Sequence, residues 1–386
     1  MQIADRISRL GVEGAFAVLQ QARALEAQGK HIVHLEIGEP DFPTPQHIVE
    51  AGKQALQDGW THYGPTMGLP DLREAIAKRL ASTHGLEIGP NRIGVMPGAK
   101  PALFFAMMAV LEKGDEVIYP DPGFPIYASM VRFLEAVPKP IPLIESRGFS
   151  FDLDRLKDSI TGKTRMLILN SPHNPTGGII PATDIRAIAD MVRGRDITVV
   201  SDEIYSTICF GEPPLSIASL EGMNQQTVIV DGFSKSHAMT GWRLGYGVYP
   251  DHLIDAVSKL MVNSNSCTAS FTQKAGVAAL EGPQSECDGM VAQFRQRRDV
   301  FCNILNSIKG FTCQIPPGAF YAFPRIVETG IESKVLSERL LTEVGVACLS
   351  GTAFGQFGEG YLRFSLANSL ANLELAGDRI RTLIQG

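Results

Sequence analysis

The feature that most limits the possible folds of this chain is an alternation between about residue 90 and residue 250. Short apolar, β-branched runs alternate there with longer amphipathic stretches. Such runs are typical of strands buried on both faces of a sheet, and the longer stretches predict helices. The predicted strands are 93–96, 117–119, 166–169, 197–200, 227–230 and 246–249, and two of the predicted helices are 101–111 and 181–193. The pattern predicts an α/β fold with an open, mainly parallel sheet that binds ligands beyond the carboxyl ends of its strands.

The two ends of the chain have a different pattern. Residues 1–30 carry apolar residues at helical spacing, and residues 286–386 mix helical stretches with short strands around a Pro-Pro-Gly turn. The length of 386 residues also exceeds the roughly 250–300 residues at which a single core stops growing. We therefore predict a large domain over residues 46–285 and a smaller α+β domain built from residues 1–45 and 286–386.

Composition narrows the classes of partner and location. The chain has 35 basic and 41 acidic residues, a net charge of −6, and no dense run of one sign, which argues against nucleic acid as a partner. The longest apolar run, residues 102–111, is shorter than the roughly 18–20 residues that cross a bilayer. The first residues lack the apolar segment of a secretory signal. We expect a cytoplasmic protein with no membrane partner.

Several metal and catalytic motifs are absent from the sequence. The six cysteines form no C-x-x-C pair and no H-E-x-x-H occurs, so we expect free thiols and no metal site. No P-loop, nucleophile elbow or dinucleotide-binding glycine motif is complete. Kinase-like, hydrolase and dinucleotide-dependent functions are therefore disfavoured.

Chemically capable residues follow several of the predicted strands. Lys235 comes after strand 227–230, and Asp202 comes after strand 197–200. A lysine becomes a Schiff-base nucleophile when it is desolvated, and a carboxylate can hold the proton of a pyridinium nitrogen. Both residues also have ordinary alternatives, because Lys235 could be a solvated surface lysine and Asp202 could cap a helix.

Two further segments could likewise have either a functional or an ordinary structural role. Residues 170–177 form a dense cluster of turn residues, in which Asn174 could donate to a phenolate-like oxygen or simply belong to a structural turn. Residues 98–101 open a predicted helix with small residues, and a helix N-terminus is a natural phosphate site. Arg243 could supply the fixed charge and forked donors for the same phosphate.

Taken together, these segments resemble a known family. NSPHNPTG at 170–177, SDEIY at 201–205 and GFSKSHAMTGWRLG at 232–245 are similar to the class I and II aminotransferases, which are pyridoxal phosphate enzymes of fold type I. Further blocks agree in order, so that the resemblance covers nearly the whole chain: LEIGEPDFPTP at 35–45, THYGPTMGLPDLREAIA at 61–77, PPGAFYAFP at 316–324 and YLRFSLANS at 361–369. The resemblance implies a mainly parallel, seven-stranded type of sheet with helices on both faces.

The resemblance implies pyridoxal 5'-phosphate as cofactor and a role for each matching position. Lys235 would form the internal aldimine and then move a proton, and Asp202 would pair with the protonated ring nitrogen. Tyr205 and Asn174 would hold the 3-oxygen of the ring, and Phe124 would stack on the ring. The residues implied as catalytic are therefore Lys235, Asp202 and Tyr205.

The same resemblance implies the phosphate and substrate ligands. The phosphate would be held by Ala99, Lys100, Ser234 and Arg243, with Tyr63 reaching it from the partner subunit of a homodimer that shares its active sites. Arg363 would bind the α-carboxylate of the substrate, with Gly38 and Asn174 lining the same pocket. Phe16, in the N-terminal segment, could cover the bound substrate.

The implied activity is transfer of an amino group from an L-amino acid to a 2-oxo acid, either 2-oxoglutarate or pyruvate, by a ping-pong mechanism. A C–S β-lyase of the same fold and a non-catalytic sensor are the alternatives. The donor stays open, although residues 262–268 contain no arginine for a second carboxylate, which weakens aspartate. Three positions depart from the commonest family pattern, Gly232, His173 and Ser350, and the role of His173 stays open.

Overall fold

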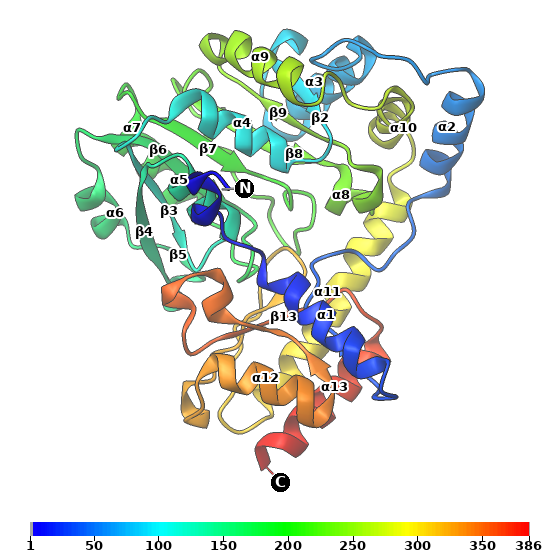
Figure 1. The fold of residues 1–386 in the computed structure, drawn as a ribbon, viewed down its shortest axis with the longest axis vertical. Coiled ribbons are helices and arrows are strands. Elements are labelled where there is room, and N and C mark those ends of the chain that lie inside the picture. Colours follow the sequence, from blue (N-terminus) through cyan, green and yellow to red (C-terminus); the bar gives the residue numbers. More distant parts are fainter. Residues whose placement is uncertain (1–2, 386) are drawn as a thin grey trace.

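The centre of the fold is an eight-stranded sheet in the order β2-β9-β8-β7-β6-β3-β4-β5, seen in the computed structural model, which describes residues 3–385 (Figure 1). The strands are β2 (Ile93–Met96), β3 (Glu116–Asp121), β4 (Val137–Ile144), β5 (Ser150–Phe151), β6 (Thr164–Asn170), β7 (Thr198–Asp202), β8 (Thr227–Gly232) and β9 (Gly245–Val248). Neighbours from β4 to β8 pair in parallel, whereas β9 is antiparallel to both β2 and β8. The predicted α/β fold with a mainly parallel sheet is confirmed, but the sheet has eight strands rather than the seven that the resemblance implies, because the two-residue β5 pairs with the edge of β4.

Strand β4 was not among the predicted strands because it contains Pro138, Pro140 and Pro142, and proline is rare inside sheets. The register explains why β4 tolerates them. Val137 donates its N–H to Asp115 beside β3, at 2.7 Å, and the odd-numbered residues that follow share this orientation. The prolines therefore stand where the N–H groups would face away from β3, and on that side only the last two residues of β4 pair with β5.

Helices cover both faces of the large sheet. On one face α4 (Lys100–Val110), α5 (Pro125–Phe133) and α9 (Ile254–Ser264) pack on a core that includes Val200 and Val228. The other face is covered by α2 (Gln46–Gln57), α3 (Pro70–His84), α6 (Leu153–Ser159), α7 (Ala182–Val192) and α10 (Ser270–Glu281). Val199 belongs to this second core, so neighbouring residues of β7 serve opposite faces.

A smaller α+β part lies below the large sheet (Figure 1). It contains α11 (Ser285–Asn306), α12 (Ser333–Val344) and α13 (Leu370–Gln385), with a three-stranded sheet of β10 (Tyr321–Ala322), β13 (Leu362–Ser365) and β12 (Leu349–Ser350). Strand β1 (Val33–His34) pairs in parallel with β11 (Val346–Ala347), which joins the N-terminal segment to this part. Leu35 shares a core with Phe301 and Phe364. These contacts support the proposed division of the chain, whose boundaries stay a prediction.

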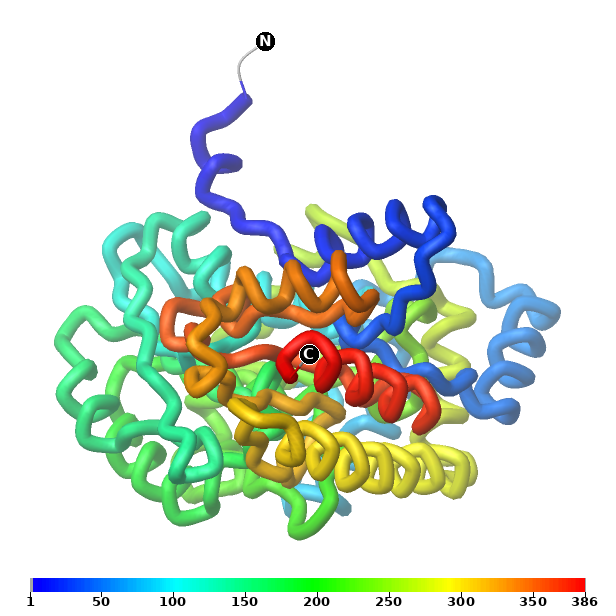
Figure 2. Tube along the Cα trace, turned by 90° about the horizontal axis from the view of Figure 1, so that it is seen from below, coloured from blue at the N-terminus to red at the C-terminus, as the bar shows by residue number. Residues whose placement is uncertain are grey.

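The N-terminal segment forms a 3-10 helix, Asp5–Arg9, and then α1 (Gly14–Glu26). The 3-10 helix projects from the body of the molecule (Figure 2). Just after it, the Gly11 N–H donates to the Ser129 hydroxyl of α5 at 2.8 Å, which ties the segment to this helix. The helical spacing predicted here is present, yet Ile7 is 49% exposed and Phe16 is 61% exposed. Most of this apolar stripe therefore lies outside the core, and Ala22 is the fully buried residue of α1.

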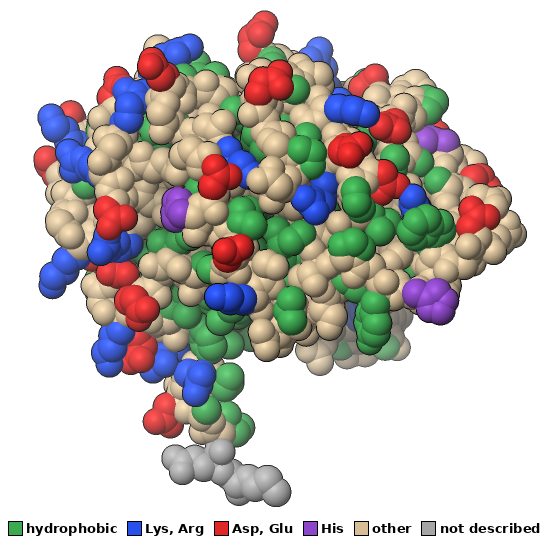
Figure 3. Space-filling model, turned by 90° about the horizontal axis from the view of Figure 1, so that it is seen from above, with side chains coloured by type: hydrophobic (Ala, Val, Ile, Leu, Met, Phe, Trp, Pro, Cys, Tyr) green, Lys and Arg blue, Asp and Glu red, His purple; other side chains and the backbone are tan. Residues whose placement is uncertain are grey.

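The surface charges and the cysteine thiols do not point to a particular partner or ligand. On the face seen from above, basic and acidic side chains lie interspersed among apolar ones (Figure 3). No helix within residues 3–385 is long and apolar enough to span a membrane, and the same residues hold no group of three or more potential metal ligands. All six cysteines are free, and the sulfur atoms of Cys302 and Cys313 lie 3.7 Å apart in the smaller part.

Candidate active site

A cavity of about 360 Å³ lies beyond the carboxyl ends of β6, β7 and β8, where the alternating pattern predicted a ligand site. Its remaining walls come from the N-terminal ends of α4 and α5, from α1, from the segment after β1, and from the smaller part. Eleven of the twelve predicted site residues line it: Gly38, Ala99, Lys100, Phe124, Asn174, Asp202, Tyr205, Ser234, Lys235, Arg243 and Arg363. The fold thus brings together residues that lie as far apart in the sequence as Gly38 and Arg363.

Lys235 lies in the single helical turn α8 (Phe233–Ser236) that follows β8. Its Nζ donates a hydrogen bond of 2.5 Å to the Gly38 carbonyl. Burial, with smaller contributions from the charges of Arg363 and Lys100, lowers the pKa of Lys235 to about 8, although the charge of Glu39 opposes the shift. An amine with this pKa is partly neutral near pH 7, as a proton-transfer group or nucleophile must be.

Asp202 is the last residue of β7 and lies on the face of the sheet that carries the cavity. The Tyr127 hydroxyl, from α5, donates to Asp202 Oδ2 at 2.6 Å. Burial raises the pKa of Asp202 to about 6, although the Tyr127 hydrogen bond opposes that shift. A carboxyl group buried in this way is best stabilised by a cation, because a nearby positive charge favours its ionised form.

Two polar residues that support this region were missed by the sequence prediction. Asn170 donates from its amide to the Asp202 carbonyl at 2.9 Å and accepts from the Asn174 N–H at 2.9 Å, so it joins the loops after β6 and β7. Tyr127 was the other. A signal for Tyr127 was its position one helical turn after Phe124, in contact with that ring at a centroid distance of 5.7 Å.

His173, whose role the sequence left open, lies outside the residues that line the cavity. Its Nδ1 is 2.9 Å from the Thr176 hydroxyl, and its side chain is buried. Burial lowers the pKa of His173 to about 3, so the ring is neutral at physiological pH. His173 therefore packs inside the turn at 170–177.

Arg363 comes from β13 in the smaller part, and it is buried. One guanidinium nitrogen donates to Asn174 Oδ1 at 3.2 Å and another donates to the Glu36 carbonyl. The guanidinium carbon lies 4.6 Å from the centroid of the Tyr321 ring and 4.9 Å from that of Phe354. Its Nε has no hydrogen-bond partner within the described part of the chain, and a buried donor of this kind is costly unless a ligand pairs with it. Arg363 is thus prepared for a carboxylate.

Tyr321, the third missed residue, closes the cavity on the side of the smaller part. Its hydroxyl lies 2.6 Å from that of Tyr205. A Cβ atom at Gly38 would lie 2.1 Å from the Tyr321 hydroxyl, so this close approach requires glycine. The block at 316–324 contained Tyr321, but nothing in the linear sequence separated it from its aromatic neighbours.

The N-terminus of α4 faces Arg243. Ala99 is the N-cap of α4, and a Cβ atom at Gly98, where φ is 93°, would lie 2.4 Å from a guanidinium nitrogen of Arg243. A Cβ atom at Gly245 would lie 2.4 Å from the Ala99 nitrogen. The glycines therefore let β9, Arg243 and the helix N-terminus converge, which makes a favourable site for a phosphate group.

The side chain of Lys100 has a partner from another element. Its ammonium group forms an ion pair with Glu13, at the start of α1, and lies 5.4 Å from the centroid of the Phe124 ring. The backbone N–H of Lys100 belongs to the first turn of α4, so it stays available for an anion whatever the side chain does.

Tyr63 is the predicted site residue that the fold does not bring to the cavity. It lies between α2 and α3 and is 91% exposed. Trp60, nearby in the same segment, is 37% exposed. Within one chain, Tyr63 therefore makes no contribution to this cavity.

The comparisons with known proteins agree on one family. Residues 30–380 match the family described as aminotransferase class I and II. The aspartate aminotransferase of Pyrococcus abyssi is 42% identical over 360 residues, which cover 92% of each chain. Among solved structures, the aromatic aminotransferase from Pyrococcus horikoshii is 41% identical, with a TM-score of 0.90 over 95% of this chain and 98% of that one. The alanine aminotransferase from Pyrococcus furiosus is 31% identical, with a TM-score of 0.94 over 100% of both chains.

Proposed function

The chain belongs to the family of class I and II aminotransferases, and we propose that this transaminase uses pyridoxal 5'-phosphate to move an amino group from an L-amino acid to a 2-oxo acid in a ping-pong cycle. The membership confirms the resemblance found in the sequence. The observation that carries the proposal is the meeting of Lys235, Asp202 and Arg363 in one cavity. They are an amine, an acid and a carboxylate receptor, which are the groups that such a reaction needs.

The residues of the cavity fit pyridoxal phosphate. When bound, this group supplies an aldehyde that condenses with amines and a ring that withdraws electrons from the reacting carbon. Lys235 is the group proposed to hold the aldehyde and, after the substrate amine displaces it, to move the proton of the substrate Cα. The lowered pKa of Lys235, about 8, suits both tasks because the amine must be neutral to accept a proton.

The acid and the polar residues around it are proposed to hold the ring. Asp202, oriented by the Tyr127 hydroxyl, would keep a proton on the ring nitrogen. Tyr205 and Asn174 would donate to the ring oxygen, and Phe124 would stack on the ring. A cationic ring beside Asp202 would offset the desolvation that raises the pKa of this acid in its absence.

The N-terminus of α4 is the proposed phosphate cradle. The convergence of the backbone at Ala99 and Lys100 with Ser234 and Arg243 supports this assignment, because helix dipole, N–H donors and guanidinium act on one anion. We propose further that Tyr63 of a second copy completes the cradle. Its exposure of 91% is consistent with burial in a homodimer that shares its active sites.

The substrate is proposed to bind through its α-carboxylate to Arg363, whose unpaired Nε supports this role. Aspartate, aromatic and alanine aminotransferases are among the similar proteins. The walls around the proposed substrate position include Phe16 and Phe354 as well as the Lys100–Glu13 ion pair. An amino acid donor with either an apolar or a carboxylate-bearing side chain would therefore find a partner group in these walls. The proposed acceptor is 2-oxoglutarate or pyruvate.

A panel of single amino acids tests the proposal. The protein saturated with pyridoxal phosphate is mixed with each donor and no oxo acid. A productive donor should convert the visible absorption of the bound cofactor to the near-ultraviolet absorption of its amine form, and 2-oxoglutarate or pyruvate should reverse the change. Pyruvate and ammonia released continuously from cystathionine without an acceptor would favour the C–S β-lyase. No spectral change with any donor would contradict both activities.

A further inference from the structure

Ionisable residues that the proposed chemistry does not use lie on the face of the sheet opposite the cavity. Successive residues of a strand point to opposite faces, so Glu203, which follows Asp202, is directed away from the cavity. Its carboxylate accepts a hydrogen bond of 2.7 Å from Ser201, the preceding residue on the same face. Asp231, on β8, shares this side of the sheet with Glu203 and accepts from the Tyr246 hydroxyl at 2.8 Å.

Glu203 is fixed by partners from three elements. Oε1 accepts from Ser201 and also from the Ser216 hydroxyl at 2.6 Å, while Oε2 lies 3.0 Å from Nε2 of His84. The side chains of His84 and Glu203 are 11% and 6% exposed, so water screens this ion pair little. Two hydroxyl donors therefore fix Oε1, and Oε2 faces the His84 ring.

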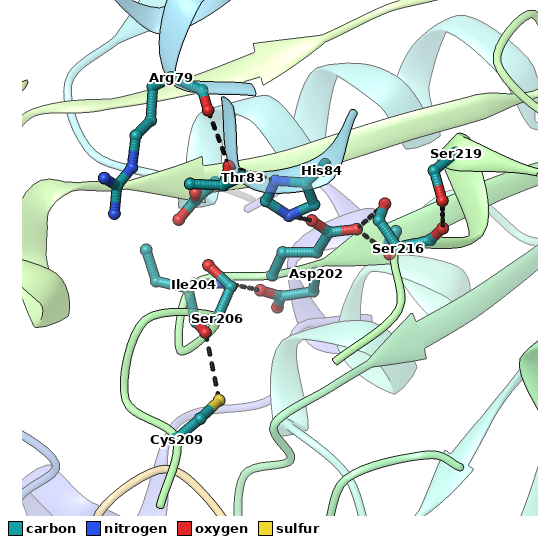
Figure 4. A network of polar contacts seen from close by, with 12 residues as sticks. Arg79, Thr83, His84, Asp202, Ile204, Ser206, Cys209, Ser216 and Ser219 are labelled. Atoms are coloured by element: carbon teal, nitrogen blue, oxygen red, sulfur yellow. Dashed lines mark hydrogen bonds and ion pairs between the residues drawn. The ribbon is translucent and has the colours of Figure 1, made fainter. Parts of the chain in front are cut away.

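His84 is the last residue of α3, and Gly85, with φ of 63°, ends the helix by donating to the Ala81 carbonyl. A cation is favoured at a helix C-terminus because the helix dipole is negative there. The second ring nitrogen of His84 lies 2.6 Å from the Thr83 hydroxyl. Figure 4 shows the His84 ring at the end of its helix, turned toward the segments that carry Asp202 and Ser216.

The charged groups that act on His84 come from the ends of two strands and from its own helix. Glu203 after β7 and Asp231 on β8 are acids, and Arg79, on α3 itself, is the cation. Burial favours neutral His84, but the hydrogen bond and charge of Glu203 outweigh it and raise the pKa of His84 above 6.5. Burial likewise favours neutral Glu203, but the hydrogen bond and charge of His84 and the two serines lower its pKa below 4.5. Burial raises the pKa of Asp231 to about 7. The opposite shifts in the pKa of His84 and of Glu203 both favour the ion pair of a His84 cation with a Glu203 anion.

Glu203 also determines how the cavity residues are presented. Its backbone N–H donates to the Val230 carbonyl at 2.8 Å, which continues the pairing of β7 with β8. Its carbonyl accepts from the Ser206 N–H at 2.8 Å, which closes the turn that carries Tyr205. Asp202 and Tyr205 therefore flank a residue whose side chain is anchored on the far face of the sheet.

We propose that His84 is a positioning residue of this transaminase, which acts through Glu203 to fix the turn bearing Asp202 and Tyr205 and to neutralise the carboxylate next to Asp202. The inference rests on the proposed function, because it assigns Asp202 to the cofactor ring. Without the His84 charge, the Glu203 anion would add to the negative potential at Asp202 and at a ring bound there. His84 is not among the residues that line the cavity, so its effect is indirect.

The test compares wild-type protein with His84→Gln, and with His252→Gln as a matched control, since His252 is exposed in the 3-10 helix Asp251–Leu253 that follows β9. Each protein is loaded with pyridoxal phosphate, and its visible absorption is titrated with pH. We expect the pH at which the bound cofactor changes colour to rise by about 0.5–1 unit in H84Q only, because added negative potential favours the protonated form. We expect kcat to fall roughly tenfold in H84Q with KM changed less than about twofold.

Apoprotein supplies a readout that is independent of activity. The raised pKa of His84 contributes stability that is fully present below pH 6.5 and is lost as the pH rises through the pKa in the folded protein. The deficit in Tm of apo H84Q relative to wild type should therefore be larger at pH 6 than at pH 9, by about 2 °C or more. The control H252Q should show no such pH-dependent deficit.

A double variant separates charge compensation from packing and serves if H84Q folds poorly. In His84→Gln/Glu203→Gln both charges are gone, so its colour change should return to within about 0.3 unit of wild type. Two results would overturn the role of His84. One is a double variant whose shift in the pH of the colour change is the sum of the shifts in H84Q and E203Q. The other is an H84Q protein whose colour change occurs at the same pH as in wild type. Failure of wild type to bind pyridoxal phosphate at all would overturn the proposed function and, with it, this inference.

Discussion

Two adjacent carboxylates at the end of β7 have opposite surroundings. Asp202 lies on the cavity face with a phenol as its partner, and burial raises its pKa to about 6. Glu203 lies on the opposite face, where burial raises its pKa but the His84 ring and two serine hydroxyls lower it below 4.5. Among residues 3–385, the acid that faces the cavity has no ion-pair partner, whereas the acid behind it pairs with His84. This difference separates a group prepared for a positively charged ligand from a group that holds the structure.

The largest expected effect on activity comes from replacing Lys235, which lines the same cavity as Asp202. We predict that Lys235→Ala loses turnover by roughly a thousandfold or more, because no other amine is as well placed to exchange with the substrate. Steady-state kinetics of protein loaded with pyridoxal phosphate, beside the exposed control Lys259→Ala, measures this loss. Near-normal transamination by K235A would contradict the proposed role of Lys235.

Asp202→Asn should separate function from stability. We expect kcat to fall by roughly a hundredfold, with less effect on cofactor affinity, since the amide cannot neutralise a protonated ring nitrogen. In the apoprotein the same change should stabilise the fold. The pKa of Asp202 is raised from 3.8 to about 6, so ionisation of the folded protein lowers its stability as the pH rises through this range.

Thermal unfolding of the apoprotein at pH 7 measures this second effect. D202N should gain up to about 3 kcal/mol over wild type, and the gain should vanish near pH 4. The exposed Asp158→Asn provides the matched control, with no expected change. A D202N apoprotein that is less stable than wild type at pH 7 would show that Asp202 is as well compensated as Glu203, and the contrast between them would fail.

Arg363→Lys probes the substrate side of the cavity. A lysine keeps the charge but loses the forked donors that bind a carboxylate in two places, so KM should rise roughly tenfold to a hundredfold. The spectral pH titration should change little, because Arg363 is assigned to the substrate. Initial rates over a range of donor concentrations measure KM, with the exposed Arg186→Lys as control. An unchanged KM would remove Arg363 from the proposed substrate site.

Glu203→Gln should give the smallest effect on the rate and the opposite sign for stability. The lowered pKa of Glu203 contributes stability that is present above pH 4.5 and is lost as the pH falls through the pKa in the folded protein. We expect E203Q to lose about 1–3 kcal/mol at pH 7, because His84 is left without its partner. Denaturant unfolding at pH 7 and pH 4 measures the difference, which should shrink at the lower pH. A gain in stability at pH 7 would reverse the comparison.

The sequence predicted those features that depend only on neighbouring residues in the chain. Continuous apolar runs are incompatible with solvent, so the strands that bear the cavity residues were predicted within a few residues of their observed bounds. Strand β4 was missed because its prolines are acceptable only in one register at one side of the sheet. The helical spacing of the N-terminal segment was recognised, but the spacing itself does not tell that Phe16 is exposed.

The supporting residues around the cavity were harder to predict for a related reason. Tyr127 and Asn170 act through single hydrogen bonds to Asp202, which lies 75 and 32 positions away in the sequence. His84 reaches Glu203 only because α3 ends beside β7. Any tyrosine, asparagine or histidine in the chain could have filled such a place, and the linear order carries no signal that selects one of them.

The sequence by itself therefore determined the α/β architecture and a set of chemically capable residues at strand ends, since burial of apolar runs and the geometry of turns are local requirements. The tertiary structure decided which acid has a cation, which donors of Arg363 are unpaired, and which side chains enclose the cavity. Those properties depend on distances between segments far apart in the chain. Because pKa values follow burial and neighbouring charges, the functional difference between Asp202 and Glu203 exists only in the folded protein.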